Sequence, residues 1–338
     1  MNNILVVNVN WLGDAVFSIP VFKALKKTYP QARITCLCVP RVKEVLQYCP
    51  YVDKVIIYDE RGKHRLPWRK WKLVRYLKKE KFDAAFLLHR SLTRALMLYL
   101  AGIPLRIGYG KASAFLTHPI AMKAEDIHRC DYYLKVLEGY GIKVQDRLCE
   151  LRLKAADMQN VDAKLGSAGI SAKENYVVLN TGGNWDLKRW SADSFALLAK
   201  RLFQEFNMKI VFSGSKKDKE YCKFIASRDT INGVPTVIMA GETNLGESLA
   251  LYKRAVVVIS ADSGPLHLAH SVGADVIGIY GPTRPEITGP RGSGRHQILF
   301  KDVGCNKAPC YHLSCSNNVC MQSVTVDDVC KAFKKICT

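Results

Sequence analysis

The turn from Asp262 to His267, D-S-G-P-L-H, has the residue types needed to bind an anion. It follows the apolar run Val256–Ser260, and its proline stands where helices commonly begin. The backbone amides of Ser263 and Gly264 would lie at the helix N-terminus, where unpaired N–H groups and the helix dipole favour phosphate. His267, in the first helical turn, would face the same ligand or pack as an ordinary structural histidine. We therefore predict an anion site at this turn.

Two other glycine-rich turns follow apolar runs in the same half of the chain. The loop 181–184, T-G-G-N, follows the run Tyr176–Asn180 and leads to Lys188 and Arg189. The turn Tyr280–Thr283 ends a third apolar run. Glycine turns beside cations suit a phosphate or pyrophosphate, whereas the alternative is a surface turn with a solvated Lys-Arg pair. Two tryptophans flanking the cations favour the first interpretation. Three such turns predict a nucleotide-binding edge.

Acidic residues stand at two further helix starts. Asp14 follows Gly13 at the end of the apolar run Ile4–Val9, so it is either a helix N-cap or a general base at the edge of a cleft. The spacing alone favours the cap. Asp218 and Glu220 follow the next glycine turn, where they would either accept hydrogen bonds from a ribose or base, or serve only the helix dipole.

Short β-branched runs alternate with helical patterns along the chain, which predicts an α/β protein with mostly parallel sheets. The expected strands are Ile4–Val9, Arg33–Val39, Lys54–Tyr58, Ala84–Leu88, Tyr176–Asn180, Lys209–Ser213, Val237–Ala240, Val256–Ser260 and Val276–Tyr280. Segment 141–173 lacks a clear apolar period, so we place the linker there and expect domains at 1–165 and 166–338. Two such halves favour a ligand cleft between them at the carboxyl ends of the strands.

Composition limits the class of protein and its partners. A chain of 338 residues with 48% apolar residues is long and apolar enough for two domains, which excludes a disordered or fibrous protein. Lys and Arg number 50 against 30 Asp and Glu, and this net charge of +20 favours anionic partners. No apolar run approaches the roughly 20 residues of a membrane-spanning helix. The start, Met1-Asn2-Asn3, lacks the cations of a signal peptide, so we expect a cytoplasmic protein.

Taken together, these motifs resemble those of glycosyltransferase family 9, the ADP-heptose:lipopolysaccharide heptosyltransferases. The matching segments are Gly13-Asp14 with Pro20 downstream, Lys188-Arg189-Trp190, Asp262–His267 and Tyr280–Thr283. The tail is similar to that of the heptosyltransferase II type, with Pro309-Cys310, Cys315 and Cys320-Met321 in place. The resemblance runs from the first strand to the last, although the loop 180–185 departs from the family's pattern.

The resemblance implies a GT-B fold: two Rossmann-like domains with parallel sheets facing a cleft, the acceptor on the N-terminal half and the nucleotide sugar on the C-terminal half. It implies inverting transfer of a heptose from ADP-heptose to the lipopolysaccharide inner core, with no metal required for catalysis. Asp14 would be the base, and Lys188 would neutralise the departing diphosphate. The donor-binding residues would be Thr181, Gly182, Asp218, Glu220, Asp262, Ser263, Gly264 and His267.

Three other functions stay open at this point. A member of the same family could use another nucleotide sugar. A GT-B-like epimerase would form its product without an acceptor. A basic nucleic-acid-binding protein would account for the net charge, but it leaves the turn at Asp262 unexplained.

Segment 61–81 carries ten Lys or Arg residues and a single acid, Glu80, with Trp68 and Trp71 among them. Any charge run is by default a solvated helix face, and cations beside aromatic rings also suit single-stranded nucleic acid. We favour a basic amphipathic helix resting on an anionic membrane, because the resemblance implies a phosphorylated lipid acceptor at the inner membrane. The residues expected to form this membrane and acceptor patch are Arg69, Lys70, Lys72 and Arg75.

Four cysteines near the end of the chain recur every five residues, at Cys305, Cys310, Cys315 and Cys320, flanked by Pro309 and His312. Structural zinc sites more often pair ligands two to four residues apart. The set is therefore either a structural zinc site or a group of reduced thiols packed in a loop, and disulfides are disfavoured in the cytosol.

Overall fold

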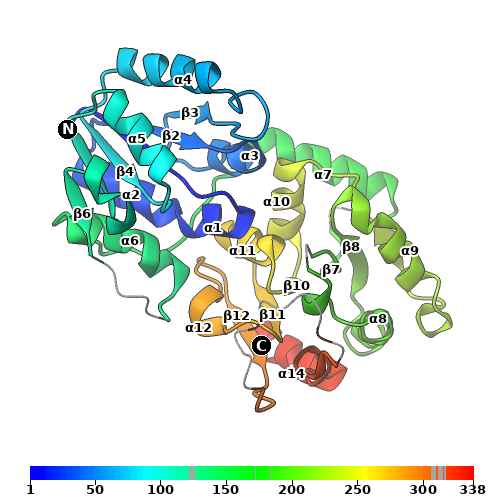
Figure 1. Cartoon of the computed structure of the whole chain (residues 1–338). Helices are drawn as coiled ribbons and strands as arrows, with labels where there is room; N and C mark the ends of the chain where they lie inside the picture. The colour runs from blue at the N-terminus through cyan, green and yellow to red at the C-terminus, as the bar shows by residue number, and fades with distance from the viewer. Residues whose placement is uncertain (122–125, 172, 184, 306–309, 311–314, 316) are drawn as a thin grey trace. The chain divides into compact units, whose positions relative to one another are not determined.

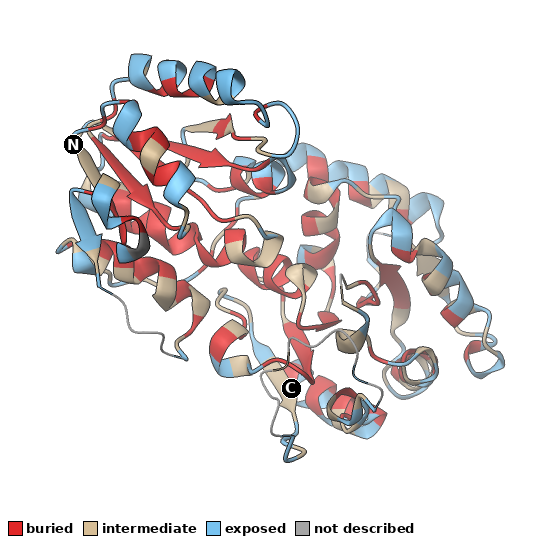
Figure 2. Ribbon diagram, viewed as in Figure 1, coloured by how far each residue is buried: buried red, intermediate tan, exposed pale blue. Residues whose placement is uncertain are grey.

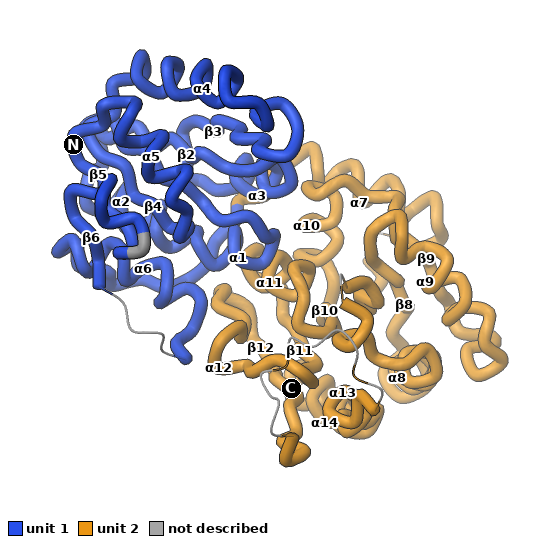
Figure 3. Tube along the Cα trace, in the orientation of Figure 1, with its two compact units in different colours: residues 1–151 blue, residues 152–338 orange. Residues whose placement is uncertain are grey.

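The computed structural model describes residues 1–121, 126–171, 173–183, 185–305, 310, 315 and 317–338. Asn184, Pro309 and His312, which the sequence analysis named, lie outside these residues. The chain forms two compact units, Met1–Leu151 and Arg152–Thr338, coloured separately in Figure 3. Each unit contains one six-stranded parallel sheet with its own apolar core.

Unit 1 (Met1–Leu151), whose helices are labelled in Figure 1, has the strand order β3-β2-β1-β4-β5-β6. Its strands are β1 (Asn3–Val7), β2 (Arg33–Cys38), β3 (Lys54–Ile57), β4 (Ala84–Leu87), β5 (Leu105–Tyr109) and β6 (His118–Ile120). Its helices are α1 (Leu12–Phe17), α2 (Ile19–Thr28), α3 (Lys43–Gln47), α4 (Pro67–Lys79), α5 (Leu92–Leu100) and α6 (Arg129–Gly139), with 3₁₀ turns η1 (Pro40–Val42) and η2 (Gly110–Phe115).

Unit 2 (Arg152–Thr338) has the order β12-β11-β10-β7-β8-β9. Its strands are β7 (Tyr176–Asn180), β8 (Lys209–Ser213), β9 (Thr236–Ile238), β10 (Val257–Ala261), β11 (Val276–Tyr280) and β12 (His296–Phe300). Its helices are α7 (Ala155–Ser167), α8 (Ala192–Phe206), α9 (Lys219–Ala226), α10 (Leu245–Arg254), α11 (Gly264–Ser271), α12 (Pro285–Thr288), α13 (Val319–Gln322) and α14 (Val326–Cys337), with 3₁₀ turns η3 (Asp186–Lys188), η4 (Lys216–Asp218) and η5 (Asp229–Ile231).

Both sheets have the same topology. In each, the first strand lies at the centre, the next two extend the sheet to one side, and the fourth, fifth and sixth extend it to the other. The order in which strands are added to the sheet therefore switches sides between β1 and β4 in unit 1, and between β7 and β10 in unit 2. Ligands of open α/β sheets bind in the crevice at such a switch point, outside the carboxyl ends of the strands.

The central strands are buried on both faces, as their continuous apolar sequences require (Figure 2). The nine predicted strands are confirmed within a few residues, but the sequence analysis missed β5, β6 and β12. Of these, β6 has three residues, one of them Pro119, and β12 has no fully buried residue. Both are edge strands, where the apolar signal is weakest.

The boundary between the units lies at Leu151/Arg152 rather than at the predicted 165/166. The predicted linker contains α7, which belongs to unit 2 and packs against α10. Two ion pairs join these helices, Lys164 to Glu247 at 2.7 Å and Arg254 to Asp162 at 2.6 Å. Among the apolar side chains of α7, only Val161 and Leu165 are strongly buried. Two apolar positions are too few to reveal a helical pattern in the sequence.

Candidate active site

Asp262 organises the switch point of unit 2. It follows β10, and its side chain is only 4% exposed. Lys188 Nζ lies 2.6 Å from Oδ2, and the Thr283 hydroxyl donates a hydrogen bond of 2.6 Å to the same oxygen. His267 Nε2, from the first turn of α11, lies 3.3 Å from Oδ1. Three segments far apart in sequence therefore meet on one carboxylate.

The electrostatics of this cluster keep Asp262 ionised. Burial raises the pKa of its carboxyl, but the hydrogen bond from His267 and the charge of Lys188 outweigh burial and hold the pKa well below its usual range. Because its carboxylate is buried and already bonded, Asp262 does not offer it to a ligand. The carboxylate instead orients the side chains of Lys188, His267 and Thr283.

Lys188 ends the 3₁₀ turn η3 and is held from two sides. Its Nζ donates to the carboxylate of Asp262 and, at 3.2 Å, to the backbone carbonyl of the same residue. It also lies 5.6 Å from the ring centroid of Trp185. An ammonium group has three donors, so one N–H remains for a further acceptor. Trp190 was expected beside the cations, but it is a core residue whose indole N–H donates to the carbonyl of Val324.

The turn at the start of α11 has the geometry predicted for it. Ser263 is extended and precedes the helix, and Pro265 stands in its first turn. Amides at the start of a helix have no acceptor within the helix. The Ser263 hydroxyl lies 3.1 Å from that of Ser260, which accepts a hydrogen bond from Asn180 at the end of β7. This chain of bonds joins the β7 and β10 turns.

The β7 turn approaches Asp218 closely. A Cβ on Gly182 would lie 2.7 Å from Asp218 Oδ2, so a larger residue there would have to displace this carboxylate. Asp218 is buried, caps its own helix through the amide and hydroxyl of Ser215, and lies 3.2 Å from Arg189. Its carboxylate is therefore largely engaged within the protein. Thr181 is also buried, with its hydroxyl 3.1 Å from the Cys222 thiol.

Glu220 does not join this group. Its side chain is 78% exposed and pairs with Lys223 along α9 at 2.9 Å. It lies in the first turn of α9, where an acid also complements the helix dipole.

Asp14 lies at the switch point of unit 1, but not as the helix cap that its spacing favoured. The residue before α1 is Trp11, and Asp14 is the third residue of the helix. Its Oδ1 accepts a hydrogen bond of 2.9 Å from the hydroxyl of Tyr133 in α6. Burial and the Asp14 charge raise the pKa of Tyr133 well above its usual value, so this hydroxyl remains a donor. Tyr133 was not predicted, since only the tertiary fold brings α6 to α1.

The predicted cationic patch lies on α4. Arg69, Lys72 and Arg75 are exposed, and Lys70 is partly exposed. Trp68 and Trp71 are 59% and 51% exposed, which excludes a role in the core. Leu73, Val74 and Leu77 form the buried face of the helix.

Beside α4 lies a cavity of about 670 Å³. Its polar and charged lining residues are Lys63, His64, Arg69, Lys72 and Tyr76. Part of the patch is therefore concave as well as cationic.

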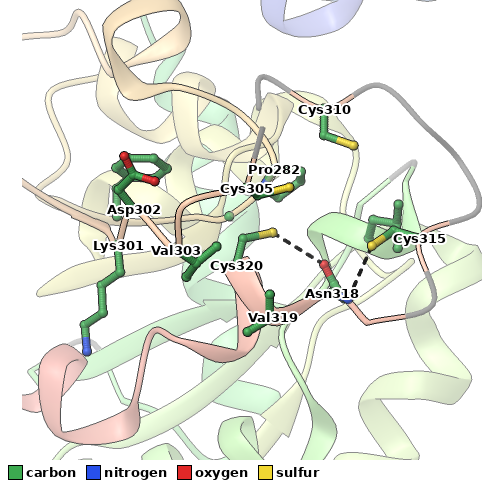
Figure 4. Close-up of a pocket in the computed structure, with 13 residues that line it drawn as sticks. Pro282, Lys301, Asp302, Val303, Cys305, Cys310, Cys315, Asn318, Val319 and Cys320 are labelled. Carbon is green, nitrogen blue, oxygen red and sulfur yellow. Dashed lines mark hydrogen bonds between the residues drawn. The ribbon is translucent and has the colours of Figure 1, made fainter. Parts of the chain in front are cut away.

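The four cysteines of the tail line one small cavity of about 50 Å³ (Figure 4). The backbone N–H of Asn318 donates a hydrogen bond to Cys315 Sγ, and the Cys320 thiol lies 3.8 Å from Asn318 Oδ1. Burial raises the pKa of Cys320. The part of the chain that the structure describes contains no group of three or more metal-type side chains able to hold an ion. The geometry of the predicted zinc site is thus not formed among those residues.

A family profile identifies the family, and solved structures show the fold. The profile described as "Glycosyltransferase family 9 (heptosyltransferase)" matches residues 70–320. Lipopolysaccharide heptosyltransferase 2 of Escherichia coli K12 is 25% identical over 301 residues, 85% of each chain. Lipooligosaccharide heptosyltransferase 2 of Haemophilus ducreyi is 26% identical over 326 residues, 90% of each chain.

Among solved structures, a family 9 glycosyl transferase from Veillonella parvula superposes with a TM-score of 0.86 at 22% identity, covering 99% of this chain and 97% of that one. The E. coli ADP-heptose LPS heptosyltransferase II superposes with a TM-score of 0.81 at 23% identity, covering 100% and 98%. These likenesses show the GT-B fold that the sequence predicted. The length of the profile match establishes the rest: the chain belongs to glycosyltransferase family 9, the heptosyltransferases.

Proposed function

We propose that this protein transfers a heptose from ADP-heptose to the anionic inner core of a lipopolysaccharide, with inversion at the anomeric carbon. The observation that carries the proposal is the cluster of Lys188, His267 and Thr283 on Asp262 beside the start of α11. It combines a cation and helix N-terminal amides, the two features that bind a diphosphate. The names of the relatives support heptose as the sugar and lipopolysaccharide as the acceptor.

In this proposal, unit 2 binds the donor. The amides at Ser263 and Gly264 hold one phosphate, and the remaining N–H of Lys188 stabilises the charge that develops on the leaving diphosphate. Thr181 and Gly182 line the same turn, and Arg189 holds Asp218 beside it. Because these protein groups supply the positive charge, we expect transfer to proceed at an unchanged rate in excess EDTA. Loss of activity that Mg²⁺ restores would contradict this expectation.

Asp14 in unit 1 is the proposed base. Its carboxylate takes the proton from an acceptor hydroxyl while that oxygen forms a bond to the anomeric carbon. The bond from this carbon to the diphosphate breaks, and its electron pair leaves with ADP. Asp14→Asn should lower kcat by about 10²–10⁴ while ADP binds as in wild type. An active Asp14→Asn enzyme would remove Asp14 from this role.

We further propose that α4 places the enzyme on the cytoplasmic face of the inner membrane. The exposed tryptophans and cations of the patch are suited to an anionic lipid surface. None of the described helices is long and apolar enough to cross a membrane.

Calorimetry with Lys188→Ala tests the donor site. ADP should bind wild type and bind the variant more weakly by about 1–3 kcal/mol, the contribution of a charge-assisted contact. Lys331→Ala, on the exposed face of α14, is the matched control and should bind like wild type. Preference for UDP or GDP would keep the transferase and change the donor. Absence of nucleotide binding, with nucleic acid copurifying instead, would favour the nucleic-acid alternative.

A further inference from the structure

A buried arginine lies at the switch point of unit 1, in a position that the proposed chemistry does not use. Arg94 is the third residue of α5, after β4, and is only 3% exposed. Charged side chains are almost never buried unless they are paired, because moving a charge out of water is costly. The contacts of Arg94 therefore indicate what it does there.

The guanidinium holds the connection between β1 and α1 at two points. Nη1 donates to the carbonyl of Asn8 at 3.0 Å, and Nη2 donates to Asn10 Oδ1 at 2.8 Å. Asn8 follows the last residue of β1, and Asn10 precedes Trp11, the residue before α1. A second side chain reaches the same connection, since His89 Nε2 lies 3.3 Å from Asn10 Nδ2. The connection is thus tied to the segment that follows β4.

This arrangement is not optimised for stability. The closest carboxylate, that of Glu60, is 3.5 Å from Nη2 and partly exposed. Arg94 Nε and Asn8 Nδ2 are both buried and have no hydrogen-bond partner among the described residues. Burying polar groups without partners costs free energy. The guanidinium therefore holds the connection before α1 although its own hydrogen bonding is incomplete.

The helix that carries Asp14 needs an external support. α1 has six residues, and Trp11 provides no side-chain cap at its start. Helices this short are not stable by themselves, so tertiary contacts must fix the first turn. Tyr133 holds the Asp14 carboxylate directly, and Arg94 holds the connection that leads into the helix.

We propose that Arg94 is a positioning residue, whose bonds to Asn8 and Asn10 set the first turn of α1 so that Asp14 meets the acceptor hydroxyl. This inference rests on the proposed role of Asp14 as the base. Arg94 itself touches no substrate in this scheme. Its effect should therefore appear in the rate of transfer and not in donor binding.

Arg94→Met tests the proposal, because methionine fills much of the same space without the guanidinium. We expect kcat to fall 10- to 100-fold, about the effect of a small misplacement of a catalytic group. We expect the KM for ADP-heptose to stay near wild type and the melting temperature to fall only modestly, because the carbonyl of Asn8 and Asn10 Oδ1 lose a donor. Arg94→Lys should recover part of the rate, since an ammonium can reach one acceptor but lacks the planar fork that reaches both.

Two controls separate the outcomes. Arg33→Met removes an exposed arginine at the amino end of β2, and it should leave kcat unchanged. Asn10→Ala should slow transfer, and combining it with Arg94→Met should cost little more than Arg94→Met alone, because both changes break the same bond. Wild-type kcat in Arg94→Met, or a loss that only follows a lower melting temperature, would overturn the role of Arg94. A wild-type enzyme that transfers no heptose would overturn the proposed function and, with it, this inference.

Discussion

The carboxylate of Asp262 differs in role from what its place in the turn suggested. The sequence analysis placed it among donor-binding residues, whereas the structure buries it under Lys188, Thr283 and His267. An exposed carboxylate would repel a diphosphate, but a buried one that is paired with a lysine fixes a cation beside the phosphate site. We therefore propose that the acid contributes to anion binding by holding its partners.

Asp262→Asn tests this role. Asparagine keeps a carbonyl oxygen for Thr283 but removes the charge that holds Lys188, so ADP affinity should fall by about 1–3 kcal/mol and the melting temperature should also drop. Calorimetry and thermal unfolding measure the two effects. Asp327→Asn, which loses an exposed carboxylate paired with Arg201, is the control. ADP affinity equal to wild type in Asp262→Asn would mean that Lys188 is positioned by other contacts.

At the scale of elements, α11 is tied to the segment before β12 through a neutral histidine. His270 Nδ1 accepts a hydrogen bond of 2.6 Å from the amide of Gly292, and Nε2 lies 2.8 Å from the carbonyl of Gly294. This pattern requires one protonated and one unprotonated nitrogen. Burial lowers the pKa of His270 to about 4, below its ordinary value of 6.5. The imidazole thus contributes to the position of the helix whose start is the proposed anion site.

The lowered pKa of His270 predicts that the stability of the folded protein depends on pH. Because the unfolded state binds the proton more readily, the contribution of His270 is complete above pH 6.5 and is lost as the pH falls toward 4. The loss amounts to at most about 3 kcal/mol. Urea unfolding of wild type and His270→Gln at pH 7.5 and 4.5 measures it: the free-energy difference between the two proteins should shrink at the lower pH. His118→Gln, an exposed histidine, should show no such change.

The helix α4 combines an apolar inner face with an outer face of cations and tryptophans. We expect reversal of Arg69, Lys72 and Arg75 to Glu to abolish binding to anionic vesicles, since each basic side chain near such a surface contributes about 1 kcal/mol. Reversal of Lys331, Lys334 and Lys335, exposed on α14, changes the net charge equally and should leave binding nearly intact. Vesicle cosedimentation at low and physiological salt compares them. Equal loss in both variants would mean that net charge, not this helix, attracts the protein.

At the scale of the whole molecule, the sequence predicted what depends on local pattern. Buried parallel strands are continuous apolar runs, so the central strands and the glycine turns at their ends were found. The edge strand β6 and the helix α7 were missed because their apolar signals are short. Tyr133 and Arg94 were missed for a different reason: each contacts a residue more than 80 positions away, and neither stands in a recognisable motif. Contacts of this kind follow from topology, which composition and spacing do not encode.

The proposed function assigns donor binding to unit 2 and the base to unit 1, and this assignment leads to a last prediction. Unit 2 has its own six-stranded sheet and a continuous core that runs from Val177 to Ile336. All the proposed donor-binding residues lie within it. We therefore expect a fragment of residues 152–338 to unfold cooperatively and to bind ADP with near wild-type affinity, although it cannot transfer sugar without Asp14. Calorimetry and circular dichroism test this, with Lys188→Ala in the fragment as the control for specific binding. A folded fragment that does not bind ADP would show that unit 1 supplies part of the donor site.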